Sequence, residues 1–230
     1  MLVPHYDNPG TLASVVDGAL AQVPDVIVVD DGSAPPGRAA AEAVADRADV
    51  VLLSPNQGKG AACMAGFRRA QERGFTHAVQ VDADGQHDLA DLPLFVDAAR
   101  SQPTALVCGV PIFDASAPKG RVIGRKISVF WVDVEVGRGV VGDPLYGFRV
   151  YPVDAAVSSG CRALRMGFDT DIAVRMVWKG APTLNLPTKV SYFARAEGGV
   201  THFRVVRDNV ALFVLHSGLF LRSLLWRLRR

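Results

Sequence analysis

Two carboxylates one residue apart, Asp82 and Asp84, follow the short, largely apolar run 78–81 and precede a turn at Gly85. Side chains alternate along an extended backbone, so the two carboxylates are expected to face the same way. Carboxylates this close repel each other unless a cation lies beside them. Mg²⁺ in proteins is often held by one or two carboxylates together with substrate phosphates. The stretch therefore predicts a seat for a divalent cation and a diphosphate; a surface turn rich in Asp and Gly is the alternative.

Two further polar loops carry residues that could bind a nucleotide. Asp30 and Asp31 end an apolar run, where a carboxylate can accept hydrogen bonds from a nucleobase or a ribose, or can instead cap a helix. In the loop 56–60, Lys59 could meet a phosphate, and its glycines allow close backbone approach. The loop partly mimics a dinucleotide fingerprint, but Cys63 stands where the third glycine is required, which disfavours a dehydrogenase.

Alternating strands and helices are expected to position these loops in the first half of the chain. Strands are expected at 1–3, 26–29, 50–53, 78–81 and 105–110, and helices at 12–20, 39–45, 61–73 and 92–100. Such alternation is typical of a parallel sheet covered by helices on both faces. Ligands bind beyond the carboxyl ends of the strands in such sheets. Because each polar loop follows a strand, the three loops should converge on one edge.

The second half of the chain is less regular. Its pattern predicts a loop at 111–120, a helix at 122–136, a turn into a strand at 143–150, a helix at 169–179, two short strands at 183–186 and 189–193 around a proline, and a hinge at 194–199. Arg125, Lys126 and Arg149 are candidates for neutralising phosphate charge, although a solvated basic face is the simpler interpretation of Lys126.

The bulk composition suits an ordinary globular protein. The chain has 230 residues, enough for one large α/β domain or two small ones. It is 49% hydrophobic and has a formal net charge of +2. This balance gives no electrostatic argument for nucleic acid binding. Cys63, Cys108 and Cys161 are isolated, with no CxxC pair, which indicates reduced cytosolic thiols rather than disulfides or a zinc site. Polar residues from position 5 onward leave no room for a secretory signal.

The tail, residues 204–230, is expected to form one helix or two. Residues 210–226 are mostly apolar but are interrupted by polar residues, and fall short of the roughly 20 apolar residues that a membrane span needs. Four arginines and no acid occupy the last ten positions. An amphipathic helix lying in the surface of an anionic membrane fits this pattern. A core helix or a homodimer helix is the alternative.

Taken together, several ordered segments resemble the family 2 glycosyltransferases with a GT-A fold. They are residues 4–8, 28–33, 56–61, 81–87, 143–149 and 167–172. Their order and spacing look most like the dolichyl-phosphate mannose synthase and polyprenyl-phosphate glycosyltransferase branch. The resemblance covers roughly residues 1–193. Two departures stand out: Tyr146 replaces the usual serine of the branch, and Asp7-Asn8 replaces its usual Asn-Glu order.

The resemblance implies a mostly parallel α/β sheet flanked by helices. A catalytic domain would span 1–193, with a nucleotide-sugar half (1–110) and an acceptor half (111–193), followed by a hinge and an amphipathic tail (194–230). The implied reaction is an inverting transfer of a hexose from a UDP- or GDP-linked donor, dependent on Mg²⁺ or Mn²⁺. The implied acceptor is a polyprenyl phosphate or a lipid hydroxyl, reached by a peripheral protein at the cytoplasmic face of the membrane.

The same resemblance assigns roles to individual residues. Nucleotide-sugar contacts would come from Pro4, Tyr6, Asp7, Asp30, Asp31, Lys59, Asp82 and Gln86, metal ligands from Asp82, Asp84 and Gln86, acceptor or phosphate contacts from Arg125, Asp143, Tyr146 and Arg149, and catalytic groups from Asp84, Asp171 and Arg149. A lipid phosphate is already anionic and needs no general base, whereas a hydroxyl acceptor does. Asp171, or second to it Asp143, is the candidate base.

Two other classes compete with a glycosyltransferase. A sugar-1-phosphate nucleotidyltransferase shares a nucleotide-binding α/β fold, but its usual Gly-rich signature with Arg and Lys near the N-terminus is absent here. A non-catalytic module that binds sugar nucleotides is disfavoured by the intact pair of carboxylates at 82 and 84.

Overall fold

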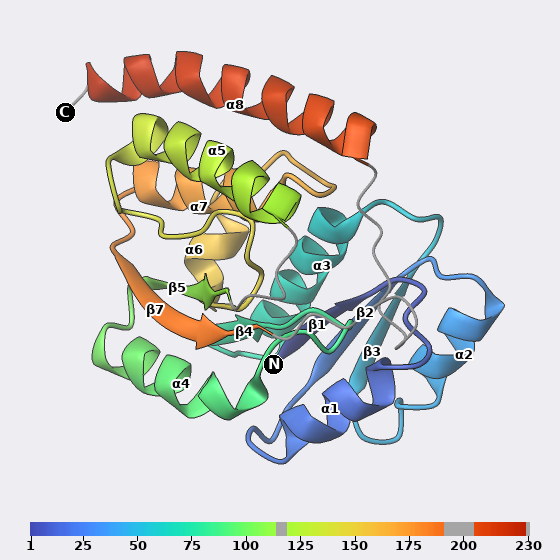
Figure 1. The fold of residues 1–230 in the computed structure, drawn as a ribbon. Coiled ribbons are helices and arrows are strands. Elements are labelled where there is room, and N and C mark those ends of the chain that lie inside the picture. Colours follow the sequence, from blue (N-terminus) through green and yellow to red (C-terminus); the bar gives the residue numbers. More distant parts are fainter. Residues whose placement is uncertain (114–118, 191–204, 229–230) are drawn as a thin grey trace.

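The computed structural model describes residues 1–113, 119–190 and 205–228, which form a central sheet with helices on both faces (Figure 1). The strands are β1 (Leu2–His5), β2 (Ile27–Asp31), β3 (Asp49–Leu53), β4 (His77–Gln80), β5 (Leu106–Ile112), β6 (Arg149–Pro152) and β7 (Thr183–Lys189). The helices are α1 (Leu12–Leu20), α2 (Pro35–Glu42), α3 (Lys59–Glu72), the 3₁₀ turn η1 (Leu89–Asp91), α4 (Leu92–Ser101), α5 (Lys119–Val136), α6 (Val153–Val157), α7 (Phe168–Trp178) and α8 (Val205–Arg227).

The seven strands lie in the order β3-β2-β1-β4-β6-β5-β7. β6 runs antiparallel to both of its neighbours, and the other six strands are parallel to one another. All residues of β1 and β2 are buried, as expected for parallel strands covered on both faces. The predicted, mostly parallel α/β sheet is therefore confirmed, with β6 inserted between β4 and β5.

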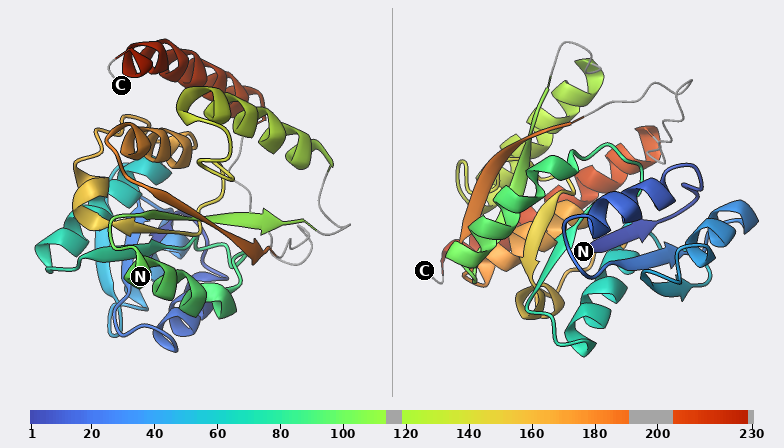
Figure 2. Two further views of the ribbon diagram at one scale, coloured as in Figure 1. Left: turned by 90° about the vertical axis from the view of Figure 1, so that its left-hand side faces the viewer. Right: turned by 90° about the horizontal axis from the view of Figure 1, so that it is seen from below.

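Two hydrophobic cores hold the layers together, one on each face of the sheet. Helices α1, α2 and α4 cover one face, where Phe95 of α4 stacks on Phe148 with ring centroids 4.3 Å apart. Helices α3, α6 and α7 cover the other face, where Phe67 of α3 contacts the rings of Tyr151 and Phe168. Figure 2 shows α5 and α8 side by side as a further layer outside α7.

The structure corrects several boundaries. Residues 183–189 form one strand, β7, which continues through Pro187 where the first predicted strand was expected to end at 186. The second predicted strand, 189–193, lies mostly outside the described residues. Pro187 is tolerated because β7 is an edge strand, where a missing backbone N–H costs no ladder bond. Helix α2 begins at Pro35 rather than at Ala39, since proline suits the first helical positions. Helix α6 was not predicted.

The tail forms one helix, α8, that packs on α5 and α7. Leu212 and Leu219 are buried, and His216 Nδ1 lies 2.9 Å from Glu135 Oε1 of α5. Residues 207–227 are long and apolar enough to cross a membrane by length and composition, which corrects the prediction that the tail falls short, although such a helix can also belong to a soluble protein. The predicted hinge at 194–199 and the predicted domain boundary lie outside the described residues.

Candidate active site

The polar loops meet at the carboxyl ends of β1, β2 and β4, as the sequence predicts. Lys59, the first residue of α3, reaches Asp82 beyond β4 with its Nζ 2.8 Å from Asp82 Oδ1. Thr11, which precedes α1, donates to the carbonyl of Ala83 at 2.6 Å. Asp7, just past β1, donates its backbone N–H to Ser33 Oγ beyond β2 at 2.9 Å. One edge of the sheet therefore gathers the three motifs.

Asp31 organises the loop between β3 and α3. Its carboxylate accepts hydrogen bonds from the backbone N–H of Gln57 (2.8 Å) and Gly58 (2.7 Å) and from the amide of Asn56 (2.9 Å). Burial raises the pKa of Asp31, and the backbone bonds from Gln57 and Gly58 oppose that rise. The carboxylate thus shapes the 56–60 loop with both of its oxygens, in addition to any contact with a nucleoside.

Gly58 is a position in that loop that requires a glycine. Its φ is +107°, a conformation that L side chains rarely adopt. A Cβ placed there would lie 2.4 Å from the carbonyl oxygen of Leu164. The loop therefore packs directly against the segment that precedes α7, so that two distant parts of the chain share one wall of the site.

The other residues predicted to hold the nucleoside lie together at this edge. Pro4 is buried within β1, and Tyr6 follows the strand and is half-buried. Asp7 adopts a left-handed φ of 49°, and its carboxylate accepts from the backbone N–H of Ala34 at 2.8 Å. Asp30 is fully buried, with Arg38 NH1 3.5 Å from its Oδ2. The β1–α1 and β2–α2 loops are thereby bound to each other.

Asp82 and Asp84 lie in the loop after β4, where both are half-buried and both line one small cavity. Asp84 Oδ1 accepts from the backbone N–H of Gln86 at 3.0 Å. The pKa of Asp84 is raised, chiefly by burial and next by the charge of Asp82, while His87 opposes the rise. A cation between the two carboxylates would relieve this repulsion.

The described residues contain no group of three or more His, Cys, Asp or Glu side chains that could hold a metal ion by themselves. Two carboxylates and the side-chain oxygen of Gln86 are nevertheless all hard oxygen donors, the type that Mg²⁺ and Mn²⁺ accept. Such ions commonly complete their coordination with water and substrate phosphates. Asp82, Asp84 and Gln86 therefore fit a divalent cation that binds together with a diphosphate.

Lys59 is held by two carboxylates in this structure. Its Nζ also lies 2.9 Å from Asp169 Oδ2, so the ammonium bridges Asp82 and Asp169. Burial would lower the pKa of Lys59, but the charges of Asp169 and Asp82 outweigh it and raise that pKa well above its usual value. The ammonium predicted to meet a phosphate is already neutralised within the protein.

Asp169 is a site residue that the sequence analysis missed. Its carboxylate is 4% exposed and accepts from Lys59 and, at 2.9 Å, from Gln80 Nε2. Burial would raise the pKa of Asp169, but Lys59 and Arg149 lower it, so the carboxylate is ionised. The segment 167–172 was recognised as a motif, yet the sequence offered no signal to prefer Asp169 over Asp171.

Asp171, the predicted general base, lies inside the protein with no exposed surface. Its Oδ2 accepts from the backbone N–H of Arg162 (2.6 Å) and Ala163 (2.9 Å), and its Oδ1 lies 2.5 Å from Arg175 Nε. These contacts tie the loop before α7 to the helix. This placement gives no support to a catalytic role for Asp171.

Arg149, predicted to be catalytic and to bind phosphate, is also fully buried. It donates to the backbone carbonyls of Asp169 and Asp143. Burial would lower the pKa of Arg149, but Tyr151, Cys108 and Asp169 raise it above its usual value. Arg149 links the segments on either side of the site and offers no surface to a ligand.

Two of the four predicted acceptor residues, Arg125 and Tyr146, line a small cavity of about 60 Å³ together with the carboxylate pair, whereas Asp143 and Arg149 do not line it. Its lining includes Asp84, Gln86, Arg125 and Tyr146. Arg125 NH1 lies 2.7 Å from both oxygens of the buried Asp143. The Arg125 guanidinium also lies over the rings of Phe113, at 5.6 Å, and Tyr146, at 5.9 Å. Asp143 therefore positions Arg125, which lines the same cavity as the carboxylate pair.

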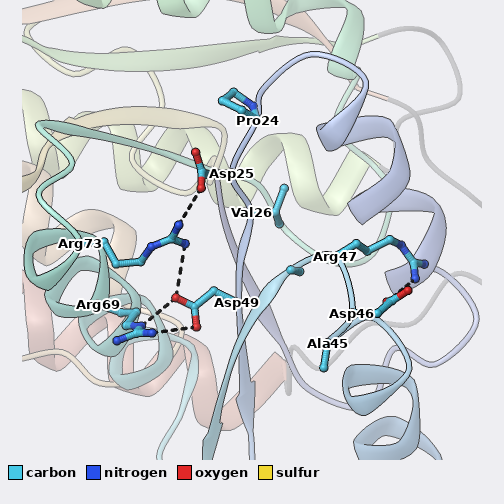
Figure 3. Close-up of a pocket in the computed structure, with 10 residues that line it drawn as sticks. Pro24, Asp25, Val26, Ala45, Asp46, Arg47, Asp49, Arg69 and Arg73 are labelled. Carbon is cyan, nitrogen blue, oxygen red and sulfur yellow. Dashed lines mark hydrogen bonds and ion pairs between the residues drawn. The ribbon is translucent and has the colours of Figure 1, made fainter.

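A larger hollow of about 480 Å³ lies at the opposite edge of the sheet, where β2 and β3 begin (Figure 3). Its charged groups are bound to one another: Arg69 Nε lies 2.7 Å from Asp49, and Arg73 lies 2.7 Å from Asp25. It contains none of the predicted site residues. The chemistry therefore belongs to the smaller cavity at the carboxyl ends of the strands.

Such an edge, with a carboxylate pair and an arginine at one cavity, fits an enzyme that handles nucleotide-linked groups. The chain matches the family described as Glycosyl transferase family 2 over residues 1–172, and it belongs to that family. It is 30% identical over 202 residues to the undecaprenyl-phosphate mannosyltransferase of Micrococcus luteus, covering 81% of this chain and 80% of the relative. It is 35% identical over 104 residues to the polyprenol monophosphomannose synthase of Mycolicibacterium smegmatis, covering 43% of this chain and 39% of that relative.

Solved structures share the fold. A glucosyl-3-phosphoglycerate synthase from Mycobacterium tuberculosis, in complex with Mn²⁺, UDP-glucose and phosphoglyceric acid, matches with a TM-score of 0.66 at 19% identity, covering 96% of this chain and 78% of that one. A mycobacterial protein matches with a TM-score of 0.67 at 22% identity, covering 94% and 74%. The predicted GT-A fold and the predicted enzyme class, a glycosyltransferase, are both confirmed.

Proposed function

We propose that this glycosyltransferase moves a hexose, mannose in the first instance, from a nucleotide-diphospho-sugar to a polyprenyl phosphate. One observation carries the proposal: the same cavity is lined by Asp84 and Gln86, which would seat the donor diphosphate with its metal, and by Arg125, a cation for an anionic acceptor. Both curated relatives carry names of polyprenyl-phosphate mannose enzymes, which supports the sugar and the acceptor.

The geometry suits direct attack by an acceptor that is already ionised. Arg125 would bind the acceptor phosphate, and Asp143 holds Arg125 through two 2.7 Å contacts. Since a phosphate needs no proton removed, no general base is required. The fully bonded, buried Asp171 agrees with such a mechanism and disagrees with a hydroxyl acceptor that relies on that residue.

The donor half would hold the nucleotide at the β1, β2 and β4 ends. Asp31 fixes the 56–60 loop, and Asp7 joins the β1 and β2 loops, so the nucleoside would meet a preformed edge. Asp82, Asp84 and Gln86 would hold Mg²⁺ or Mn²⁺, which when bound neutralises charge on the departing diphosphate. The acceptor attacks the anomeric carbon from the opposite face, which inverts its configuration.

The donor and the reaction class can be tested together. GDP-mannose, UDP-glucose and UDP-N-acetylglucosamine would be titrated calorimetrically with Mn²⁺ and with EDTA, followed by transfer assays with a polyprenyl phosphate. We expect metal-dependent binding of GDP-mannose and release of free GDP. Absence of transfer, together with release of pyrophosphate when the protein is instead given a nucleoside triphosphate and a sugar 1-phosphate, would point to a nucleotidyltransferase. Binding of every donor with neither reaction would point to a non-catalytic module.

An apolar face on α5 and α8 would bring the site to its lipid acceptor. We define the α5–α8 face by its exposed apolar side chains: Ile123, Ile127 and Phe130 of α5, and Val210, Phe213, Val214, Leu221, Leu224 and Leu225 of α8. The two helices that carry these residues pack side by side and form one layer of the molecule (Figure 2). Lys126, Arg222 and Arg227 lie on the same helices and are exposed.

The proposed partner of this face is the anionic, cytoplasmic surface of a membrane. Apolar side chains beside basic ones are typical of helices that lie in the headgroup region. The packing of α8 on α5 through His216 and Glu135 favours a helix that stays on its domain over one that leaves to span the bilayer. A homodimer through the same face is the competing occupant.

Phe213, 67% exposed on α8, gives the test of this surface. We expect Phe213→Glu to weaken binding to vesicles of anionic phospholipid by on the order of tenfold, because an apolar contact is lost and a repelled charge is added. Ser217→Glu, which adds the same charge at an exposed polar position of α8, is the matched control and should have a smaller effect. If the wild-type protein does not bind vesicles but sediments as a dimer, the α5–α8 face would instead be a surface for self-association.

A further inference from the structure

A buried set of polar side chains lies directly beneath the carboxylate pair. Asp169 at the start of α7 accepts from Gln80 Nε2 of β4 at 2.9 Å and from Lys59 Nζ of α3 at 2.9 Å. The same Lys59 Nζ lies 2.8 Å from Asp82 Oδ1. Side chains from three elements thus meet around one ammonium, next to the proposed metal seat.

The backbone at Gly147 packs closely against these side chains. A Cβ at Gly147 would lie 2.9 Å from Lys59 Nζ, 2.9 Å from Asp82 Oδ2 and 3.0 Å from Gln80 Nε2. Arg149, two residues further on, donates to the backbone carbonyl of Asp169. Close packing therefore fixes the positions of the Lys59 ammonium and of Asp169. Neither is an exposed side chain that rotates freely.

We propose that Asp169 is a positioning residue that holds Lys59 beside Asp82, and that Lys59 serves as an internal cation for the proposed metal seat. In this role Lys59 keeps Asp82 in place before the divalent ion and the donor arrive, and competes with that ion for the charge of Asp82. Asp169 weakens the competition between Lys59 and the divalent ion, because its carboxylate neutralises part of the ammonium charge. The inference rests on the metal seat of the proposed function.

Because two carboxylates share one ammonium, the proposal predicts the direction in which each substitution changes the affinity for a divalent ion. Without the charge of Asp169, the whole ammonium remains with Asp82, so a divalent ion should bind more weakly. Without both charges, the competing cation is gone and the seat keeps Asp82 and Asp84, so the ion should bind at least as tightly as in the unaltered protein. Generic damage to the fold predicts the reverse order, with the double variant weakest.

The experiment is a titration of the full chain with Mn²⁺ alone, followed by electron paramagnetic resonance of the free ion. We expect Asp169→Asn to raise the Kd for Mn²⁺ by roughly tenfold, through the unshared Lys59 charge. The double variant Lys59→Met/Asp169→Asn should return the Kd to the wild-type value or below. Asp154→Asn, at an exposed aspartate that accepts from Gln71 of α3, is the matched control and should leave the Kd unchanged.

The outcomes distinguish a failure of the inference about Asp169 and Lys59 from a failure of the proposed metal seat. A Kd that is the same in Asp169→Asn as in the wild type, or weakest in the double variant, overturns the inference and leaves the proposed function standing. A wild-type protein that binds no Mn²⁺ overturns the metal seat and the inference with it. Thermal unfolding of each variant shows whether it is folded. If Asp169→Asn is not, Lys59→Met alone replaces it and should bind Mn²⁺ at least as tightly as the wild type, because the competing cation is gone; weaker binding in that variant overturns the inference.

Discussion

Asp84→Asn is expected to nearly abolish sugar transfer, lowering kcat/KM by roughly a thousandfold. The substitution removes a charge at the proposed metal seat but keeps an oxygen that can still accept from the backbone N–H of Gln86. Because Asp84 carries a raised pKa from burial and from Asp82, loss of its charge should not destabilise the fold. Initial rates with saturating Mn²⁺, together with thermal unfolding, test both parts.

The matched control lies in the same loop. Asp88→Asn removes a carboxylate that accepts from the backbone N–H of Ala90 at the start of η1, away from the proposed seat. It should cost at most about 1 kcal/mol of stability and little activity. If Asp84→Asn turned over like the wild type while still requiring the metal, the assignment of Asp84 as a ligand would be wrong.

Gly58→Ala is expected to destabilise the protein by about 3–5 kcal/mol and to eliminate nucleotide binding. Alanine is strained at a φ of +107°, and its Cβ would meet the carbonyl of Leu164 at 2.4 Å. The backbone N–H of Gly58 also donates to Asp31, so displacement of the loop would disturb the proposed nucleoside edge. Denaturant unfolding gives the stability, and nucleotide titration gives the binding.

A substitution at Gly74 separates the backbone strain from the steric clash, the two causes of the lost stability in Gly58→Ala. Its φ is +77°, and a Cβ there would meet no atom within 4 Å. Gly74→Ala therefore carries the conformational cost alone, about 1–2 kcal/mol. An equal loss at both positions would show that the contact of the 56–60 loop with Leu164 contributes nothing.

Local patterns were sufficient for most of the first half of the fold. The helix at 12–20 was predicted with its observed bounds, and β2, β3, β4 and α3 lie within two residues of their predictions at each end. These elements could be predicted because buried parallel strands are continuous apolar runs and the polar glycine loops after them are local signals. The convergence of the loops followed from parallel topology alone.

The second half depended on contacts distant in sequence. β6 lies between β4 and β5 and is antiparallel to both. No local feature of residues 149–152 predicts that pairing. The insertion buries Arg149, which the sequence analysis had assigned to a phosphate. A buried arginine bonded to two carbonyls and an exposed one facing a ligand have the same sequence signature.

The sequence by itself determined the family, the parallel α/β plan and the carboxylate pair, because those depend on periodicity, on turn residues and on the spacing of adjacent side chains. Only the tertiary structure decided which charges are free to meet a ligand. Asp169 and Asp171 are two residues apart on α7, yet one faces Lys59 and the other faces Arg175. Residues two apart on a helix point about 200° apart, and the side that faces the site is set by packing against the sheet.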